Sequence, residues 1–537
     1  MRRLPGILII TGATLVVMVA LLVSGLRLVL PQLDHFRPQL VAWAQSAAGV
    51  PLEIGSMTGR WESFGPTLEI EKLRTSLPES DWQVDRITLA LDVWQSLLHG
   101  RWQFRDLTFH QLKLDINSQF TGQQQDSKLL ESGKVSDLFL RQFDHFDLRD
   151  SHITFLTPSG SRAELSIPQL TWLNSEKRHR AEGLISLSSF NGQHGVVQMR
   201  MDLHDDQGLL SNGTFYLQAD NIDMKPWLSR WMKNTTGLES ADFSLAAWLN
   251  VRDGDIHSGD VFLNHGTANW GEGSDAHRLN VDDMTLHVSR QENGWQVDVP
   301  ELNLATDGVA WPKGQLSALW LPKNEHMLGP DRQEALRVRA SNLALERVST
   351  LLPLLSGTTP ELKARWDELQ PTGTLNTVAV DIPLQQPERT RFQANWQDVS
   401  WKQWKLLPGV DHFSGSARGS AERGQVSVEL KQSTLPYVDM FRAPLEIKQA
   451  SGTIDWRNDA QGLALWSHGL DVQAKSLWAN GDFRYEQPAK QEPKLDILAG
   501  IRLTDAADAW RYYPELFMGT ELVDYLSGAL KGGRVDN

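Results

Sequence analysis

The chain has 537 residues, enough for three or four domains of about 150 residues or for one elongated domain. Hydrophobic residues make up 41% and charged residues 22%, which excludes disorder throughout. A net charge of −14 leaves no basic surplus for neutralising phosphates and argues against a nucleic-acid partner. The chain has no cysteine, so disulfides, thiolate metal sites, iron–sulfur clusters and cysteine nucleophiles are excluded.

Residues 1–30 predict a cytoplasmic N-terminus followed by a membrane anchor. Residues 7–26 carry no charge, and a helix of about 20 residues spans a bilayer core of roughly 30 Å. Arg2 and Arg3 precede the run, so the positive-inside rule predicts a single pass through the inner membrane, with the bulk of the chain in the periplasm. A signal peptide cleaved after Gly25 is the alternative, but the run exceeds the usual length of about 7–15 residues. The side chains taken to represent the anchor are Ile7, Leu15, Val19, Leu22 and Leu26.

Residues 31–51 predict a short juxtamembrane helix. Its apolar residues recur at helical spacing, Pro38 is expected at its first position, and Gly49 and Pro51 are expected to end it. The helix either lies at the membrane interface or simply caps the start of a sheet.

From residue 52 onward, apolar and polar residues alternate with the period of two that is typical of antiparallel strands with one apolar face. We divide this part into residues 52–330 and 331–537. The alternation changes phase at Gln111, as a bulge or bend would cause. Hairpin turns are expected at Asn-Gly and Asp-Gly pairs, which tolerate positive φ angles. These pairs begin at Asn191, Asn212, Asp253, Asn293, Asp307 and Asn480. Short helices are expected at residues 226–233, 348–355 and 506–516.

We find none of the common catalytic motifs in the sequence. It lacks the His-Glu-x-x-His zinc motif, the phosphate-binding Gly-x-x-x-x-Gly-Lys-Ser/Thr loop and the Gly-x-Ser-x-Gly elbow. We therefore expect no catalytic residues, no cofactor and no metal, and predict that the protein is not an enzyme. The 21 tryptophans are consistent with packing on sheet faces or with stacking on sugars.

Strands with one apolar face must shield that face from water by packing it against another apolar surface. Several sandwiches would cover it with a second sheet. A single long trough would instead leave an apolar groove for another apolar molecule. The strand pattern alone favours sandwiches.

A resemblance to a known family favours the trough. The anchor is followed by Gly49-Val50-Pro51-Leu52-Glu53-Ile54-Gly55, Gly59-Arg60-Trp61 and Gly65-Pro66-Thr67-Leu68. Further on come Asn395-Trp396, Leu407-Pro408-Gly409, Arg442-Ala443-Pro444 and Asp455-Trp456. In this order, these motifs resemble the AsmA-like family in its YhdP-type branch, over essentially the whole chain.

The resemblance implies a mostly β fold: an N-terminal transmembrane helix followed by an elongated, twisted antiparallel β-sheet trough with a few short helices. It also implies a bridge-like lipid transfer protein that moves phospholipid toward the outer membrane and supports its permeability barrier. YhdP-type proteins are longer, so the resemblance implies an N-terminal portion whose periplasmic or outer-membrane protein partner lies at the absent far end.

The alternating apolar residues nearest the anchor are the candidates for lining the lipid groove. They are Leu68, Ile70, Ile87, Leu89, Leu91, Leu107, Phe109, Leu112, Leu114, Ile116, Val197, Met199 and Met201. An error of one residue in phase would place them on the wrong face. The alternative function is a periplasmic β-rich carbohydrate-binding or envelope-assembly protein without lipid cargo.

Overall fold

The computed structural model describes most of the chain. The described residues are 4–48, 51–62, 65–77, 80–99, 103–119, 138–156, 162–189, 195–206, 210–225, 237–291, 294–323, 333–354, 360–404, 407–489 and 491–536. They form two compact units. The first comprises Met1–Arg230 with Ser240–Thr267, and the second Trp231–Glu239 with Ala268–Asn537.

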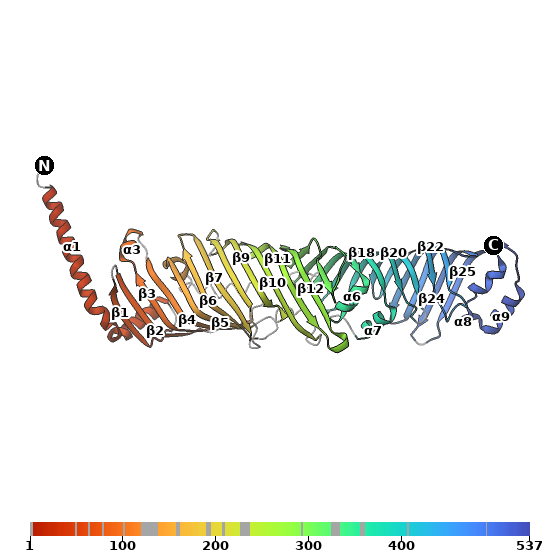
Figure 1. Cartoon of the computed structure of the whole chain (residues 1–537), viewed down its shortest axis with the longest axis horizontal. Helices are drawn as coiled ribbons and strands as arrows, with labels where there is room; N and C mark the ends of the chain where they lie inside the picture. The colour runs from red at the N-terminus through yellow and green to blue at the C-terminus, as the bar shows by residue number, and fades with distance from the viewer. Residues whose placement is uncertain are drawn as a thin grey trace. The chain divides into compact units, whose positions relative to one another are not determined.

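The N-terminal part is helical. Helix α1 (Leu4–Val29) leads into the 3-10 helix η1 (Leu30–Phe36) and helix α2 (Arg37–Ala48). Pro38 is the second residue of α2 rather than the first. Gly49, expected to end this helix, lies outside the described residues. In Figure 1, α1 extends away from the strands of its unit.

The apolar side chains of α1 point outward. Leu15, Val19, Leu22 and Leu26 are 62%, 41%, 61% and 37% exposed, respectively. The side chain of Ile7 lies outside the described residues. Such exposure is unfavourable in water and suits a helix surrounded by lipid.

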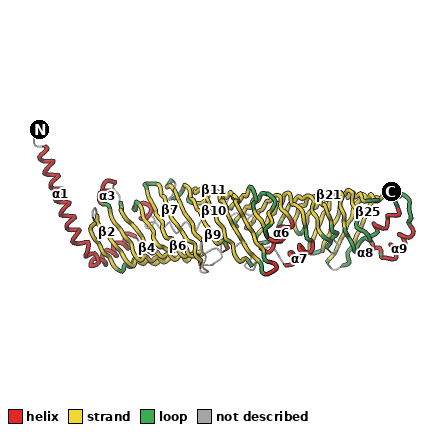
Figure 2. Tube along the Cα trace, in the orientation of Figure 1, coloured by secondary structure: helices red, strands yellow, loops and turns green. Residues whose placement is uncertain are grey.

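Strands β1 to β10 of the first unit pair in chain order, every pair antiparallel except β4 with β5 (Figure 2). Among the described residues, helix α3 (Val93–His99) precedes β4, and the single π-helical turn η3 (Leu138–Gln142) precedes β5. The strands up to β11, which crosses the unit boundary, are β1 (Ser56–Glu62), β2 (Gly65–Leu77), β3 (Ser80–Leu91), β4 (Phe104–Gln119), β5 (His145–Leu156), β6 (Arg162–Asn174), β7 (Arg178–Ser189), β8 (Gly195–His204), β9 (Asn212–Asp223), β10 (Leu238–Arg252) and β11 (Asp255–Trp270).

The second unit is also an antiparallel sheet. Strands β16 to β26 pair in chain order, β12 pairs with both β13 and β14, and β13 pairs with β16. Its strands are β12 (His277–Gln291), β13 (Gly294–Val299), β14 (Leu304–Thr306), β15 (Val309–Ala310), β16 (Leu316–Leu321), β17 (Ala335–Ala344), β18 (Thr372–Pro383), β19 (Arg391–Trp401), β20 (Val410–Ser420), β21 (Arg423–Leu435), β22 (Leu445–Asp459), β23 (Gly462–Ala474), β24 (Leu477–Pro488), β25 (Lys494–Leu503) and β26 (Val535–Asp536).

These pairings confirm a mostly β chain with an N-terminal apolar helix, antiparallel strands and few other helices. Within each unit, the described strands belong to one open sheet rather than to two packed sheets. The sandwich interpretation, which the strand pattern alone favoured, is therefore wrong. The described strands of each unit are hydrogen-bonded edge to edge in one sheet, mostly to their neighbours in the chain, so no described strand forms a second layer over the apolar face.

Short helices accompany the second sheet. The helix expected at 348–355 is confirmed by α6 (Leu345–Leu351) and η6 (Leu352–Leu354). The helix expected at 506–516 is confirmed by η8 (Ala506–Tyr512) and α8 (Glu515–Met518). The helix expected at 226–233 lies outside the described residues. Helices that the sequence analysis missed include α3 and α7 (Pro360–Leu369). Other short helices in the described part of the second unit are η4 (Gly273–Asp275), η7 (Pro387–Arg389) and α9 (Thr520–Ala529).

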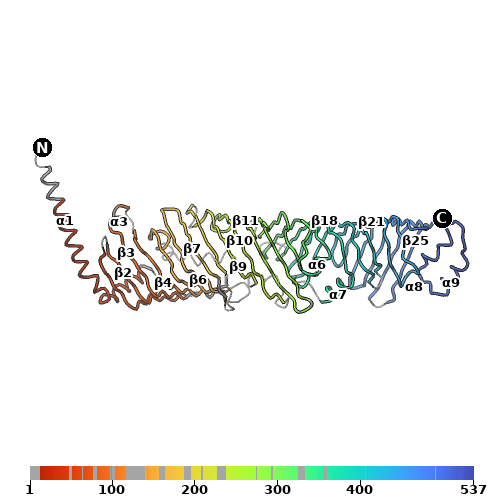
Figure 3. The backbone as a smooth tube through the Cα atoms, viewed as in Figure 1, coloured from red at the N-terminus to blue at the C-terminus, as the bar shows by residue number. Residues whose placement is uncertain are grey.

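Arg442 holds the last helices of the second unit, whose chain Figure 3 follows from β21 to α9. Its guanidinium donates to both carboxylate oxygens of Glu515 at 2.8 Å and to Asp524 at 2.6 Å. The bond from Arg442 lowers the pKa of Glu515 to about 2, so this bridge persists in all but strongly acidic solution.

Residues with positive φ bend the strands. Lys72, Gln111 and Asp150 have φ angles of 54°, 55° and 48° in β2, β4 and β5. At Lys72 and Gln111 two polar residues follow one another between apolar ones, as His110 and Gln111 do between Phe109 and Leu112. At Asp150 the next residue is Ser151, a buried polar side chain. The phase change predicted at Gln111 is therefore confirmed. The bends of neighbouring strands align, and on the polar face they border a hollow of about 310 Å³.

The predicted turns are partly confirmed. Asp253-Gly254 and Asp307-Gly308 have positive φ at both residues and connect β10 to β11 and β14 to β15. By contrast, Asn212-Gly213 lies in β9 and Asn480-Gly481 in β24, so these two predictions were wrong. A Cβ on either glycine would collide with the backbone of the neighbouring strand. Glycine therefore allows the two strands to approach closely there and does not form a turn. Asn191 and Asn293 lie outside the described residues.

The bend at Gln111 predicts a residue-specific stability effect. Replacing Gln111 with Val should destabilise β3 and β4 by about 1–2 kcal/mol, because a β-branched side chain is disfavoured at positive φ. Gln111→Gly should be tolerated. Hydrogen exchange of the β3 and β4 amides in the full chain would measure the effect. Lys113→Val, an exposed position in the same strand, is the control, and an equal loss in both Val variants would contradict the bend as its cause.

Candidate functional site

The strand register of the first unit aligns apolar residues in rows that cross the sheet. Side chains directly opposite each other in paired strands lie on the same face. One row, which we call the main apolar row, runs from β1 to β10 through Met57, Ile70, Ile87, Phe109, Leu148, Leu170, Gly183, Met199, Leu217 and Ala247. A parallel row runs from β5 to β10 through Phe146, Trp172, Ala181, Met201, Phe215 and Leu249. These rows define the apolar face of the unit.

The groove candidates named from sequence fall in such rows. Leu68, Leu89 and Leu107 are directly opposite one another, and Leu91 is opposite Phe104. Leu112 faces Val84 and Leu114 faces Ile153. Val197 lies between Ile185 and Ala219, and Met199 and Met201 lie in the two rows above. The side chain of Ile116 is outside the described residues, although its backbone pairs with Ser80.

Burial varies along the apolar face. In β4, Leu107 is 1% exposed and Phe109 is 8% exposed. Further along the main apolar row, Met199 and Leu217 are only half-buried. Along the main apolar row, side chains are therefore more buried at β4 than at β8 and β9, whereas Met201 in the parallel row is 8% exposed.

Helix η1 covers the start of this face, next to α1. Leu30 is buried, and the Asp34 carboxylate accepts a hydrogen bond from the Met57 N–H at 3.2 Å. Gly59 of β1 allows this approach, since a Cβ there would lie 2.6 Å from Leu33 Cδ1 and 2.7 Å from the Leu30 carbonyl oxygen. The α1 helix is thereby joined to the first strand of the apolar face.

A second segment covers the face at β4 to β6. This segment is the η3 turn (Leu138–Gln142) with Phe143 directly after it. The Phe139 ring centroid lies 5.4 Å from that of Phe109 and 5.3 Å from that of Phe146. The Phe143 ring packs 5.3 Å from Phe104. The sequence analysis missed this cluster, because the aromatic residues that meet here come from three separate segments without a common period.

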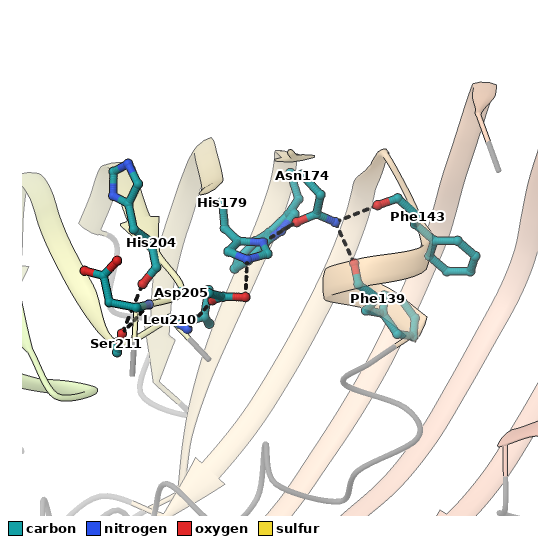
Figure 4. A network of polar contacts seen from close by, with 10 residues as sticks. Phe139, Phe143, Asn174, His179, His204, Asp205, Leu210 and Ser211 are labelled. Atoms are coloured by element: carbon teal, nitrogen blue, oxygen red, sulfur yellow. Dashed lines mark hydrogen bonds and ion pairs between the residues drawn. The ribbon is translucent and has the colours of Figure 1, made fainter. Parts of the chain in front are cut away.

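A polar network holds the η3 turn (Figure 4). The Asn174 amide donates to the carbonyl oxygens of Phe139 at 2.7 Å and Phe143 at 2.9 Å. The Asn174 carbonyl oxygen lies 2.7 Å from His179 Nδ1, and the other nitrogen of that fully buried ring lies 3.2 Å from the Asp205 carboxylate. Polar side chains buried beside an apolar face are tolerable only with such partners.

The base of the η3 turn is fixed by an ion pair. Asp144 accepts the Phe104 N–H at 3.1 Å, and its carboxylate lies 3.1 Å from His145 Nδ1. The hydrogen bond to Asp144 raises the pKa of His145, against the effect of burial. Burial alone would raise the pKa of Asp144, but the hydrogen bonds from His145 and Phe104 together outweigh it and lower that pKa.

The second unit has its own apolar face, built by the same register rule. One row runs from β13 to β25 through Val297, Ala318, Val338, Val380, Phe392, Gly419, Gly424, Trp456, Leu465, Tyr485 and Leu495. A neighbouring row includes Leu316, Ala340, Val378 and Ala394. Bends at Asp398, His412 and Gln432 again have positive φ.

Within the described residues, no group of three or more His, Asp or Glu side chains is arranged to hold a metal ion. Trp270 packs inside the second unit: it is 1% exposed and its indole N–H donates to the Thr350 carbonyl oxygen at 3.0 Å. The prominent feature of both units is thus an apolar face, suited to holding apolar groups by exclusion of water.

A sequence profile described as "YhdP protein" matches residues 1–537. The chain belongs to the YhdP family. It is 54% identical over 540 residues to a protein of Escherichia coli (strain K12) named intermembrane phospholipid transporter YhdP. That alignment covers 100% of this chain and 42% of the relative, so the chain spans less than half the relative's length. No solved structure matches the chain.

The close approach at Gly59 predicts how η1 can be dislodged. Gly59→Val should push η1 off β1, because overpacking costs about 1–3 kcal/mol. Exchange of the Met57 amide, which now donates to Asp34, should become roughly tenfold to a hundredfold faster. Thr58→Val changes the exposed neighbour on the opposite face and should leave this exchange unchanged. A similar acceleration in both variants would show that Gly59 has no special role.

The Asp144–His145 pair predicts a pH dependence at the base of the η3 turn. Because the pKa of His145 is raised above 6.5, its contribution is fully present below pH 6.5 and is lost as the pH rises through the raised value. The lowered pKa of Asp144 means that its contribution is present above pH 3.8 and is lost only under stronger acid. Corrected for the intrinsic rate, exchange of the Phe104 amide should therefore accelerate on the alkaline side. In His145→Gln this acceleration should disappear; its persistence would contradict the assignment.

Proposed function

We propose that this chain is the membrane-proximal part of an inner-membrane-anchored lipid-transfer protein. In this proposal, phospholipid acyl chains lie on the apolar faces while their head groups stay in water. The observation that carries it is the unbroken register of apolar rows from β1 to β10, which begins beside the exposed apolar helix α1. The Escherichia coli relative is named an intermembrane phospholipid transporter, which supports the same cargo.

The physical basis is the cost of exposing hydrocarbon to water. Each CH₂ group kept out of water is stabilised by about 0.8 kcal/mol. Neighbouring strands lie about 4.8 Å apart, so an acyl chain that moves along a row always contacts the next apolar side chain before it leaves the last. A row of apolar side chains thus lowers the barrier to movement without requiring a specific pocket.

The proposed topology places the N-terminus in the cytoplasm, α1 across the inner membrane and both units in the periplasm. Arg2 and Arg3 before the apolar run favour this orientation. We further propose that lipid moves toward the outer membrane, where it supports the permeability barrier, and that a periplasmic or outer-membrane protein receives it.

Photo-crosslinking in intact cells tests this proposal. Light-activated residues at Met199 and Val378, one on the apolar face of each unit, should yield phospholipid adducts detectable by mass spectrometry. Arg200 and Thr377 are the matched controls, since each is the adjacent residue, points to the opposite face and is more exposed. Nonspecific labelling would favour the exposed controls. Equal adducts on both faces, or none on the apolar face, would contradict the lipid-transfer function.

A further inference from the structure

The η3 turn occupies the apolar face where that face is most deeply buried. Phe139 packs against Phe109, Phe143 and Phe146, with ring centroids 5.3–5.4 Å apart. Leu140 of the same turn is 5% exposed. Phe139 and Leu140 belong to the connection between β4 and β5 rather than to the sheet, so they occupy the apolar surface of the sheet without being part of it.

The surface beneath the η3 turn has the chemistry of an acyl-chain site. Its walls are the rings of Phe104, Phe109, Phe146 and Trp172, and Phe146 and Trp172 are stacked at 5.7 Å. The main apolar row and its parallel row both pass through this surface. Contacts between hydrocarbon groups are non-directional, so an acyl chain can replace the Phe139 and Phe143 side chains there without loss of a specific bond.

What keeps the turn in place is polar and specific. A π-helical turn bonds residue i to i+5, so a single turn leaves carbonyl oxygens without helical partners. Asn174 donates to two of them, those of Phe139 and Phe143. Its own oxygen accepts the Trp172 indole N–H at 2.7 Å and lies 2.7 Å from His179 Nδ1, which fixes the orientation of the amide. The Asp205 carboxylate lies 3.2 Å from the other ring nitrogen of His179, without hydrogen-bond geometry.

We propose that the η3 turn is a self-occupied lipid site: Phe139 and Phe143 fill an acyl-chain binding site formed by Phe104, Phe109, Phe146 and Trp172, and Asn174 is the latch that lipid passage must open. This inference rests on the proposed lipid-transfer function. It adds a defined control point to a surface that otherwise offers uniform apolar contact. Because the rings exchange one apolar neighbour for another, the hydrogen bonds of Asn174 set the balance between the closed and lipid-filled states.

Asn174→Asp tests the latch with minimal change in shape. The carboxylate keeps an acceptor for Trp172 and His179 but cannot donate to the two carbonyl oxygens. A photo-crosslinker at Leu148, in the main apolar row beside Phe109, should then give about tenfold more phospholipid adduct, the size expected for losing one or two hydrogen bonds. Exchange of the amides of residues 138–143 should accelerate as well. Asn250→Asp, the same change at an exposed site, should alter neither.

A second experiment locks the η3 turn in place instead of releasing it. The chain has no cysteine, so Phe104→Cys with Phe143→Cys provides two unique thiols at positions whose rings now touch. Joining them with a short bis-maleimide should abolish lipid adducts at Met199 and leave those at Ile70, on the α1 side of the turn, unchanged. The same double variant without the reagent is the control, which separates the lock from the loss of two rings.

The outcomes separate this inference from the proposed function. If the unmodified protein gives no adducts at Ile70 or Met199, lipid transfer itself fails. If both sites are labelled but the lock leaves Met199 unaffected, lipid passes without opening the turn and the latch is overturned. If Asn174→Asp speeds exchange of the turn without raising adducts at Leu148, the turn does not compete with lipid. Should Asn174→Asp fail to fold, the lock alone decides.

Discussion

The constraint on which the rest of the structure depends is the strict pairing register of consecutive strands. A side chain in a strand points to one face or the other with a period of two, and directly opposed residues share a face. Because β1 to β10 pair in chain order, Met57, Ile70 and Ile87 become the start of one continuous row. A slip of one residue in a single strand would interrupt that row with a polar side chain. The apolar face is thus a product of pairing rather than of any one strand.

Aligned bends preserve this face while the strands change direction. Gln111 adopts a positive φ, and two polar residues follow one another there before the apolar alternation resumes at Leu112. A positive φ recurs at Lys72 and Asp150, and in the second unit at Gln432. The strain of a positive φ is confined to exposed polar residues, whose side chains stay in water, so the cost to the apolar rows is small. The bends therefore reshape the sheet without moving apolar side chains to the polar face.

The two covers of the first apolar face act in different ways. Helix η1 meets β1 through a close approach at Gly59, where any larger side chain would collide. The η3 turn meets β4 to β6 through aromatic rings and is held by Asn174. The steric fit of η1 against Gly59 is lost abruptly when it is disturbed. The hydrogen bonds of Asn174 over an apolar surface instead give two defined states, bonded and open. The first suits a permanent junction with the anchor and the second suits a site that must be vacated.

The sequence by itself determined the N-terminal apolar helix, the β class and the phase of most strands. These features depend on local patterns: the uncharged run of residues 7–26, the alternation from residue 52 onward and the double polar step at Gln111. Tertiary structure decided the rest. It showed that neighbouring strands form one sheet in each unit instead of sandwiches, and that Gly213 and Gly481 serve close strand packing rather than turns. It also brought Phe139, Asn174 and His179 together from separate segments. Periodicity reports which face a side chain takes, but only the folded chain fixes what comes to lie against that face.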